Sequence, residues 1–330
     1  MIQQLRAFTY ERQQLGANAA PDAAKALEDV IAVYSSHPSA PLSLHARARQ
    51  MDAEAFHRLD VLRVPAMRMS IHMLPAKSAH LAFHATPAPP ADRKKRMKHF
   101  KFTEERYDEL RRKILDVATE LLTLPELREA VGAEPDELKG ISAQMTRDAE
   151  LVRLGAKGLR SNELRYVAIE LPEADPDDAL AWLAGEYLRA FGPVRPKDFQ
   201  WWAGVTAGRA KRALAAHDTE ELDGGLLIGA QDVKAFEQAK PPKNTVDLLP
   251  KWDPYTMGYA PDGRDRFAHP DVVKDCYDFR GDGRPVILLD GEAAGTWEKL
   301  EPQLFDSLPA KTREAIDERL VAVRAFLESD

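Results

Sequence analysis

A repeated order of helices and hairpins is the feature that most constrains the fold of this chain. A long helix, a short helix, a third helix and a small β-hairpin are predicted three times along its 330 residues. The clearest copy spans residues 103–170, where apolar residues recur at intervals of three and four and predict one buried helical face. Those residues are Tyr107, Leu110, Ile114, Val117 and Leu121. This order is typical of a winged helix-turn-helix, whose third helix fits the DNA major groove while the hairpin lies along the backbone.

Capping and turn residues predict the boundaries of this clearest copy. Thr123 and Glu126 form a capping-box pattern that opens the short helix, and Gly132 is expected to end it. Pro135 then opens the third helix, and residues 165–169 have the composition of a strand.

The other two copies repeat the architecture but not the residues. In the later copy, Thr206 is expected to cap a third helix, and Asp223-Gly224 predicts a hairpin turn. In the N-terminal copy, the predicted helices lie around residues 27–34, 41–47 and 52–59, with strands within 66–74. The apolar faces of the two first helices comprise Leu180, Leu183, Tyr187 and Phe191 in the later copy, and Leu27, Val30, Ile31 and Tyr34 in the N-terminal one.

The last quarter of the chain has a different character. After Pro241-Pro242, an apolar run, an Asp290-Gly291 turn and a second run predict a β-hairpin. A terminal helix carrying Ile316, Leu320, Val323 and Leu327 is expected to pack against it. The predicted fold class is therefore α+β, mainly α with small β-hairpins. We assign winged helices 1, 2 and 3 to residues 1–90, 91–172 and 173–240, and a β-rich subdomain with a terminal helix to 241–330.

Composition limits where such a protein works. The net charge of −7 excludes a uniformly basic nucleic-acid coat, so any contact with DNA must come from local patches. Cys276 is the only cysteine, which excludes an internal disulfide or a cysteine zinc cluster and suits a reducing compartment. Neither a basic-then-apolar leader nor a membrane-length apolar run is present. We expect a cytoplasmic monomer, nucleoid-associated if it binds DNA, with no membrane partner.

Basic side chains gather where the winged-helix interpretation needs them. Residues 93–101 contain six Lys or Arg and no acid, and are interpreted either as DNA-facing or as a solvated linker. The candidate DNA-binding residues lie on third helices and hairpins, where phosphate contacts would depend on salt. They are Arg68, Arg147, Arg153, Lys157, Arg160, Arg165, Arg209, Lys211 and Arg212. Two alternatives stay open, since these charges also suit a solvated surface or a protein-docking module.

Several stretches carry a more specific signal in combination. The first stretch contains Leu248-Leu249-Pro250 and residues 252–255 (Trp-Asp-Pro-Tyr). The second contains Asp290-Gly291 and Gly295-Thr296-Trp297. Residues 67–72 and 191–204 fit two further signatures in the same chain order. Together these segments resemble the AlkZ/YcaQ-like winged-helix DNA glycosylases. The resemblance implies tandem winged helices around a concave basic channel for double-stranded DNA. It also implies excision of alkylated bases, including the unhooking of interstrand crosslinks in some members.

The chain departs from that family where catalysis is expected. Characterised members carry Gln-apolar-Gln or Gln-apolar-Asp just before Asp-Pro, and here Tyr34 and Ser36 occupy those positions, followed by His37. Base removal passes through an oxocarbenium-like transition state attacked by water, which favours a carboxylate or amide acceptor over a hydroxyl. His37 is a candidate general base near neutral pH, a candidate DNA contact, or a residue that shapes a loop.

Two further acceptors are candidates if they reach the channel. His72 on a predicted strand is otherwise a buried structural histidine, and Asp253 before proline is otherwise a turn anchor. Trp201 and Trp202 are expected to be core residues rather than base-stacking platforms. The sequence contains no P-loop, dinucleotide fingerprint, zinc-protease helix or nucleophile elbow, so we expect no cofactor and no metal.

Three hypotheses about function follow. The first is a cofactor-free hydrolase that excises alkylated or bulky bases from DNA. The second is a DNA-damage binder or regulator without catalysis, and the third is a protein-interaction scaffold.

Overall fold

The computed structural model describes residues 1–36 and 38–330, without the side chains of Pro90 and Ala156. Within that part of the chain the α-helices are α1 (Ile2–Arg12), α2 (Ala23–Asp29), α3 (Ser39–His45), α4 (Ala53–His57), α5 (Ala76–Ala85), α6 (Pro90–Phe100), α7 (Glu104–Val117), α8 (Leu124–Val131), α9 (Pro135–Arg147), α10 (Pro176–Phe191), α11 (Pro196–Ala203), α12 (Ala207–Leu214), α13 (Val233–Gln238), α14 (Pro254–Met257) and α15 (Ala310–Glu328). Short 3-10 helices are η1 (Gly16–Asn18), η2 (Ala230–Asp232), η3 (Pro261–Arg266) and η4 (Val273–Cys276).

The strands form small sheets. They are β1 (Ala20–Asp22), β2 (Val33–Tyr34), β3 (Ala48–Gln50), β4 (Val61–Ala66), β5 (Ser70–Pro75), β6 (Leu122–Thr123), β7 (Leu151–Ala156), β8 (Leu164–Ala168), β9 (Thr219–Leu222), β10 (Leu226–Gly229), β11 (Val246–Leu249), β12 (Val286–Leu289), β13 (Glu292–Glu298) and β14 (Glu301–Leu304). Among the described helices, none combines the length and apolarity that crossing a membrane requires.

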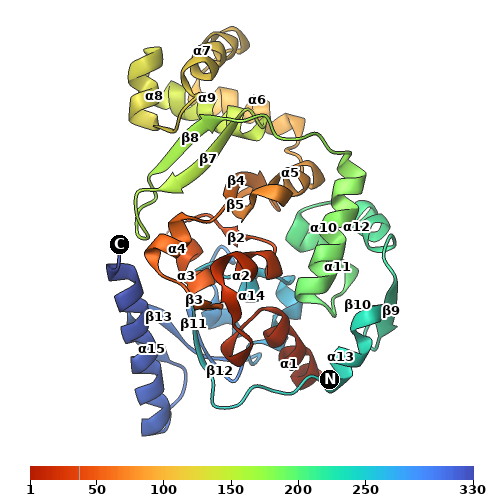
Figure 1. Ribbon diagram of the computed structural model, residues 1–330. Coiled ribbons are helices and arrows are strands. Elements are labelled where there is room, and N and C mark those ends of the chain that lie inside the picture. The colour runs from red at the N-terminus through yellow and green to blue at the C-terminus, as the bar shows by residue number, and fades with distance from the viewer. Residues whose placement is uncertain (37) are drawn as a thin grey trace.

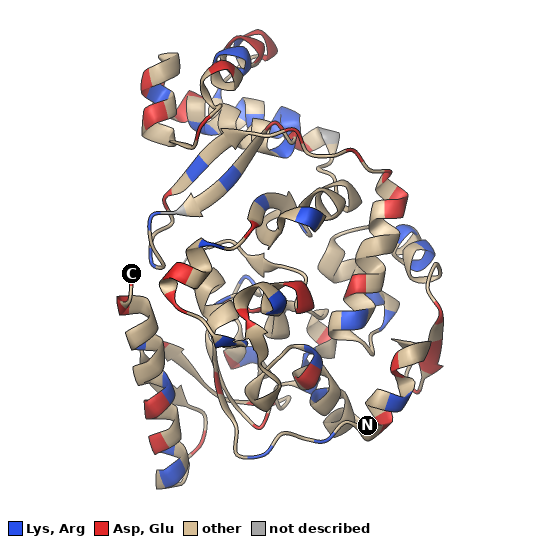
Figure 2. Cartoon of the chain, in the orientation of Figure 1, with Lys and Arg blue, Asp and Glu red and all other residues tan. Residues whose placement is uncertain are grey.

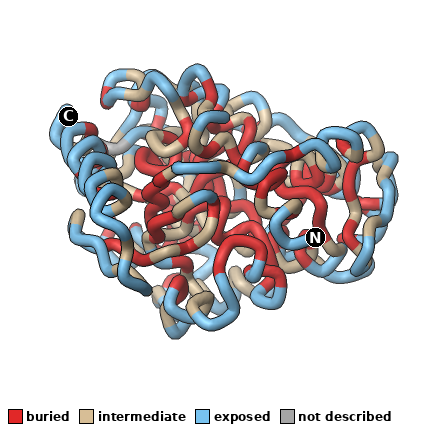
Figure 3. Tube along the Cα trace, turned by 90° about the horizontal axis from the view of Figure 1, so that it is seen from below, coloured by how far each residue is buried: buried red, intermediate tan, exposed pale blue. Residues whose placement is uncertain are grey.

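The chain wraps around its own N-terminal third. In Figure 1 the elements α1 to β5 occupy the middle of the view, the segment from α6 to β8 lies above them, and α10 to β10 lie to the right. The helix α15 stands at the lower left, beside the C-terminal strands. Figure 3 shows the buried stretches gathered in the interior, with the turns of α15 largely exposed.

Two antiparallel sheets organise this arrangement. The larger has the order β2-β5-β4-β7-β8-β6, and β4 joins β7 through the pair Arg63 and Arg153. The hairpins expected for winged helices 1 and 2 therefore share one sheet. The smaller sheet has the order β11-β12-β13-β14, and the Trp297 indole N–H donates to the Leu249 carbonyl at 3.0 Å.

Most predicted elements are present, and the α+β class is confirmed. Thr123 and Glu126 form the predicted capping box, and Gly132 ends α8 in the left-handed region. Thr206 caps α12 through the Arg209 amide. The grouping of these elements into winged helices, and the boundaries between them, stay predictions.

Three expectations about individual elements are wrong. Leu121 was expected on a buried helical face but is exposed, because α7 ends at Val117. Tyr34 was placed on a helix but lies in β2, because α2 ends at Asp29 and Ile31 turns the backbone left-handed at φ 72°. Residues 93–101 are not a linker, since all but the last belong to α6, which ends where Lys101 adopts φ 56°. This helix packs closely on α9, because a Cβ built at Gly140 would lie 2.5 Å from the Phe100 Cβ.

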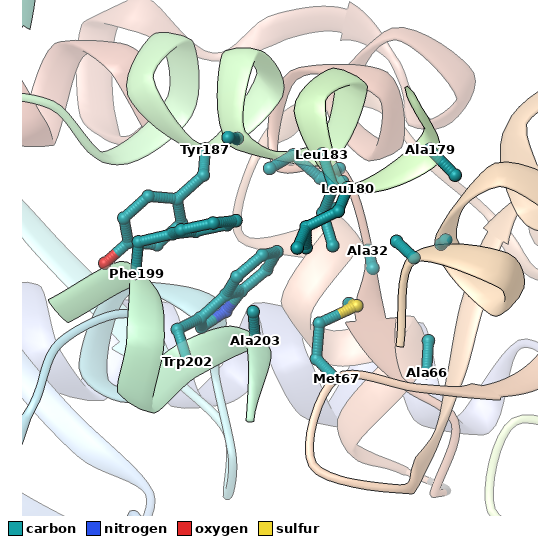
Figure 4. Packing of buried hydrophobic residues seen from close by; sticks show 14 of the residues in the cluster. Ala32, Ala66, Met67, Ala179, Leu180, Leu183, Tyr187, Phe199, Trp202 and Ala203 are labelled. Carbon is teal, nitrogen blue, oxygen red and sulfur yellow. The ribbon is translucent and has the colours of Figure 1, made fainter. Parts of the chain in front are cut away.

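The largest hydrophobic core anchors the elements around the site. Its buried residues come from α5, α10, α11, α12 and the end of β4. Figure 4 shows Met67 of the β4–β5 turn beside Trp202 and Ala203 of α11. This packing fixes the turn that follows Met67 against the end of α11.

The first helix ties distant parts of the chain together. On α1, the Tyr10 hydroxyl donates to Asp247 at 2.6 Å, and Arg6 forms an ion pair with Glu292 at 2.6 Å. Burial and the Asp247 carboxylate raise the pKa of Tyr10 above its ordinary value, so its hydroxyl remains a donor.

Candidate functional site

A pocket of about 810 Å³ lies where the N-terminal third, the β7–β8 hairpin, α11 and the C-terminal quarter meet. Its lining combines arginines with aromatic rings. The lining residues are Tyr34, Ser35, Ser36, Arg68, Ser70, Ile71, Arg153, Asn162, Leu164, Trp201, Trp252, Met257, Pro261, Arg264, Arg280, Gly281 and Asp282.

A strained turn holds Arg68 in this pocket. Strands β4 and β5 pair up to Ala66 and Ser70, and the Ser70 amide donates to the Met67 carbonyl at 3.3 Å. Arg68 and Met69 between them have φ values of 55° and 60°, as a type I′ turn requires. The Arg68 amide also donates to the Ala203 carbonyl at 3.3 Å, which docks the turn on the end of α11.

Arg68 and Arg264 both lie over the ring of Trp201. The guanidinium carbons are 3.9 and 5.3 Å from the ring centroid, and that of Arg264 is 3.6 Å from the ring of Tyr277. Cation–π contacts of this kind hold a guanidinium in place without neutralising it.

Three guanidinium groups of the pocket keep unused donors. The buried Nε–H groups of Arg68, Arg153 and Arg264 have no hydrogen-bond partner among the described residues. A buried donor without a partner costs about 1 to 3 kcal/mol, so a rearrangement that brings an acceptor to these groups would be favoured.

The arginines around the pocket lie close enough to lower one another's pKa. Burial and the Arg68 charge lower the pKa of Arg264, partly offset by Tyr277. Burial, with Arg96 and Arg153, lowers the pKa of Arg147 to about 10. A pKa of about 10 leaves Arg147 charged at neutral pH, and several arginines line the pocket, so the site is electropositive.

Tyr34 and Ser36, which the family resemblance places at the catalytic positions, both line the pocket. The Tyr34 hydroxyl accepts a hydrogen bond from Arg68, and its ring centroid lies 4.5 Å from that of His72. Burial raises the pKa of Tyr34, while Arg68 opposes that shift. The hydroxyl is therefore protonated and already engaged at neutral pH. His37, the candidate base beside them, lies outside the described residues.

His72 lies behind Tyr34 and does not line the pocket. Its Nδ1 is 3.0 Å from the Ser70 carbonyl, which fixes that nitrogen as the protonated donor. Burial lowers the pKa of His72 to about 3, with a smaller contribution from Arg68. The imidazole is therefore neutral at physiological pH.

Asp253 is buried and bound on both oxygens. Arg47 donates to its Oδ1 and Oδ2 at 2.6 and 2.8 Å, and the Ser43 hydroxyl donates to Oδ2 at 2.9 Å. The Tyr255 amide donates to Oδ1 at 2.9 Å, so Asp253 also caps α14. This carboxylate is outside the pocket lining and anchors the C-terminal quarter to α3.

The structure brings only some of the predicted DNA-binding arginines together. Arg68 and Arg153 line the pocket, and Arg147 lies close enough to Arg153 to feel its charge. Arg160 lines a second, mainly apolar pocket of about 540 Å³ that shares Trp252 with the first. Lys157 and Arg165 are exposed on the β7–β8 hairpin, where Figure 2 shows several basic positions.

The basic residues of α12 lie elsewhere. None of the described residues lining the main pocket comes from this helix. Arg209 is bound to Asp177 at 3.3 Å, whereas Lys211 and Arg212 are exposed. The expected surface shared between α12 and α9 or β7 stays a prediction.

Among the pocket residues that sequence reasoning missed, five have charged or aromatic side chains, namely Trp201, Trp252, Arg264, Arg280 and Asp282. Trp202 is buried in the core as expected, but its neighbour Trp201 lies under Arg68. The last three lie in a stretch of short 3-10 helices and turns without periodicity, so no pattern could have identified them. No group of three or more His, Cys, Asp or Glu placed to hold a metal occurs among the described residues.

Comparison with known proteins assigns this chain to a family. The family model described as DNA glycosylase AlkZ-like matches residues 27–326, so the chain belongs to that family. Its fold is similar to the solved structure of the Streptomyces sahachiroi DNA glycosylase AlkZ, with a TM-score of 0.78 and 19% sequence identity. The similarity covers 98% of this chain and 97% of that one. No curated protein sequence matches the chain.

Proposed function

We propose that this protein binds double-stranded DNA and hydrolyses the N-glycosidic bond of an alkylated or bulky base. The observation that carries the proposal is a single pocket that combines four arginines with three aromatic side chains. Membership of the AlkZ-like family and the fold shared with a DNA glycosylase support it.

The arginines suit a DNA strand entering the pocket. Phosphate oxygens accept charge-assisted hydrogen bonds, and the side chains of Arg68, Arg153 and Arg264 line the pocket. Glycosylases turn their target nucleotide out of the duplex into a pocket, where bases contact aromatic rings. Tyr34, Trp201 and Trp252 provide such rings, and the volume of about 810 Å³ lies in the range of ligand sites.

The wider binding surface follows from the sequence interpretation. The third helices and hairpins of three winged helix-turn-helix units would carry the duplex, with Arg147, Lys157, Arg160 and Arg165 near the pocket. Arg209, Lys211 and Arg212 would contact more distant phosphates. We place this DNA-repair activity in the cytoplasm, at the nucleoid, and in a monomer.

An excision assay tests the catalytic proposal. Purified protein is incubated with duplexes containing either N7-alkylguanine or an interstrand crosslink, and abasic sites are revealed by alkaline strand cleavage. We expect excision without added cofactor, and an undamaged duplex of the same sequence is the control. Complete absence of abasic sites from both damaged substrates would contradict the enzymatic function.

Tyr34 and Ser36 favour a second candidate, a damage binder without catalysis. Hydroxyls stand where the family places amides or carboxylates, and that of Tyr34 is taken by Arg68. A binder would give salt-dependent gel shifts with damaged duplex but no excision. If neither appears, the scaffold hypothesis remains.

A further inference from the structure

Asp282 places a carboxylate in the pocket to which the proposed function is assigned. Of the described residues lining that pocket, it is the one acidic side chain. It comes from the C-terminal quarter of the chain, far in sequence from the stretch 34–37 where the family resemblance places catalysis.

Hydrogen bonds within the loop fix the position of Asp282. Asp278 Oδ1 accepts the amides of Arg280 and Asp282 at 2.9 and 3.0 Å, and the Asp278 amide donates to the Asp282 carbonyl at 2.9 Å. A β-bridge between Tyr277 and Gly283 closes the loop at its base. Asp282 is therefore positioned by the fold rather than carried on an open segment.

The carboxylate of Asp282 is not committed to a structural role. The described part of the chain offers its side chain no hydrogen bond or ion pair, and the residue is half-buried. Asp253, by contrast, has both oxygens bound. Asp282 is also near enough to Tyr34 to contribute, after burial, to the raised pKa of that phenol. The other charged and titratable side chains that line the pocket are Tyr34, Arg68, Arg153, Arg264 and Arg280.

We propose that Asp282 is the acceptor that holds the attacking water, in place of the amide or carboxylate missing at Tyr34 and Ser36. The inference rests on the proposed function. A carboxylate is the stronger acceptor for a water proton and stabilises positive charge on the sugar, which neither hydroxyl does. Asp282 lines the same pocket as Tyr34 and Ser36.

The reaction balances without a cofactor. The bond between C1′ of the deoxyribose and the ring nitrogen breaks, and its electron pair neutralises the cationic alkylated base, which leaves. The water oxygen bonds to C1′, and the released proton passes to the Asp282 carboxylate and then to solvent. The arginines hold the flanking phosphates, whose negative charge offsets theirs when DNA is bound.

Single-turnover excision by full-length variants tests this assignment. The change is Asp282→Asn, which keeps size and removes the charge, with Asp282→Glu as the conservative variant. Asp275→Asn is the matched control, because Asp275 is an exposed carboxylate on η4 outside the pocket. His37→Ala is measured in parallel. Affinity is measured on a duplex whose lesion carries a 2′-fluoro sugar that resists cleavage.

We expect Asp282→Asn to lower the single-turnover rate on N7-alkylguanine by about 10²- to 10⁴-fold, the range for a lost general base. Affinity for the resistant duplex and the thermal midpoint should change little. Asp282→Glu should restore part of the rate, and Asp275→Asn should match the wild type.

Each other outcome overturns a distinct statement. Full activity of Asp282→Asn beside an active wild type would overturn the role of Asp282 and leave the glycosylase function standing. Loss of activity in His37→Ala but not in Asp282→Asn would assign the base to His37. A wild-type protein that excises nothing would overturn the glycosylase function and this role together. A rate lost in parallel with affinity or thermal midpoint would make Asp282 structural.

Discussion

Met69 adopts a backbone conformation that its side chain disfavours. With φ at 60° it lies in the left-handed region, where an L side chain costs about 1 to 2 kcal/mol. The strain supports the presentation of Arg68 and is expected to be relieved by glycine.

Met69→Gly should therefore stabilise the protein by about 1 kcal/mol. The measurement is the denaturant midpoint by circular dichroism. Glycine placed instead within strand β4, at the half-buried Val61, should lower stability. A destabilised Met69→Gly would mean that the side chain contributes more by packing than its backbone costs.

Asp253 illustrates a residue whose charge serves the fold. Its carboxylate and the Arg47 guanidinium are both fully buried, with side-chain exposures of 0%. Removing one partner leaves an uncompensated buried charge, so Asp253→Ala should cost about 3 to 5 kcal/mol. The exposed Asp306→Ala serves as the control for measurement by denaturant unfolding. A loss below about 1 kcal/mol would show that Arg47 finds another acceptor.

Among the secondary-structure elements, features that depend on residues adjacent in sequence could be predicted. Features that depend on tertiary contacts could not. The capping box at Thr123 and the turn at Asp290-Gly291, whose φ values are 52° and 78°, depend on residues adjacent in sequence. Helix α1 was missed because Leu5, Ala7, Phe8, Thr9 and Tyr10 are all buried, so no single apolar face marks it. The pocket could not be predicted, because its lining residues are spread between positions 34 and 282 and come together only through tertiary packing.

Two pairs of arginines on different elements allow a direct comparison. One double variant combines Arg68→Ala and Arg153→Ala and removes two positive charges from the pocket. The other combines Arg209→Ala and Arg212→Ala and removes two positive charges from α12. Each double variant should flatten the dependence of log affinity on log salt by about two phosphate contacts. Only the pocket variant should also slow single-turnover excision at saturating DNA.

Gel shifts at several salt concentrations, together with excision rates, make this comparison. An α12 variant with wild-type affinity and salt slope would identify Arg209 and Arg212 as a solvated surface. A pocket variant with an unchanged slope would refute phosphate binding by Arg68 and Arg153.

For the whole molecule, a buried histidine, His72, and a half-buried one, His45, link stability to pH. Burial lowers the pKa of His72 to about 3 and, with a contribution from Arg319, that of His45 to about 4. The unfolded chain takes up protons near pH 6.5, while the folded protein does so only below about pH 4. Above pH 6.5 the two histidines are neutral in both the folded and the unfolded chain and cost no stability. Below that value the unfolded chain binds their protons first, so the free energy of unfolding falls as the pH falls.

His72→Gln should weaken this pH dependence by up to about 1.4 kcal/mol per pH unit between pH 6.5 and 5. The free energy of unfolding is measured at both ends of that range, with the exposed His269→Gln as the control. Equal slopes for wild type and His72→Gln would show that His72 takes up its proton in the folded state as readily as in the unfolded one.

The contacts of helix α1 bear on the order in which a ribosome can complete this protein. Tyr10 and Arg6 leave the ribosome before their partners Asp247 and Glu292, which follow 237 and 286 residues later. Domains generally fold as they are made, from the N-terminus onward. Here helix α1 stays without these partners until residues 247 and 292 have been translated. In the same way, Arg68 and Arg153 remain separated from Asp282 in the nascent chain until residue 282 has been made.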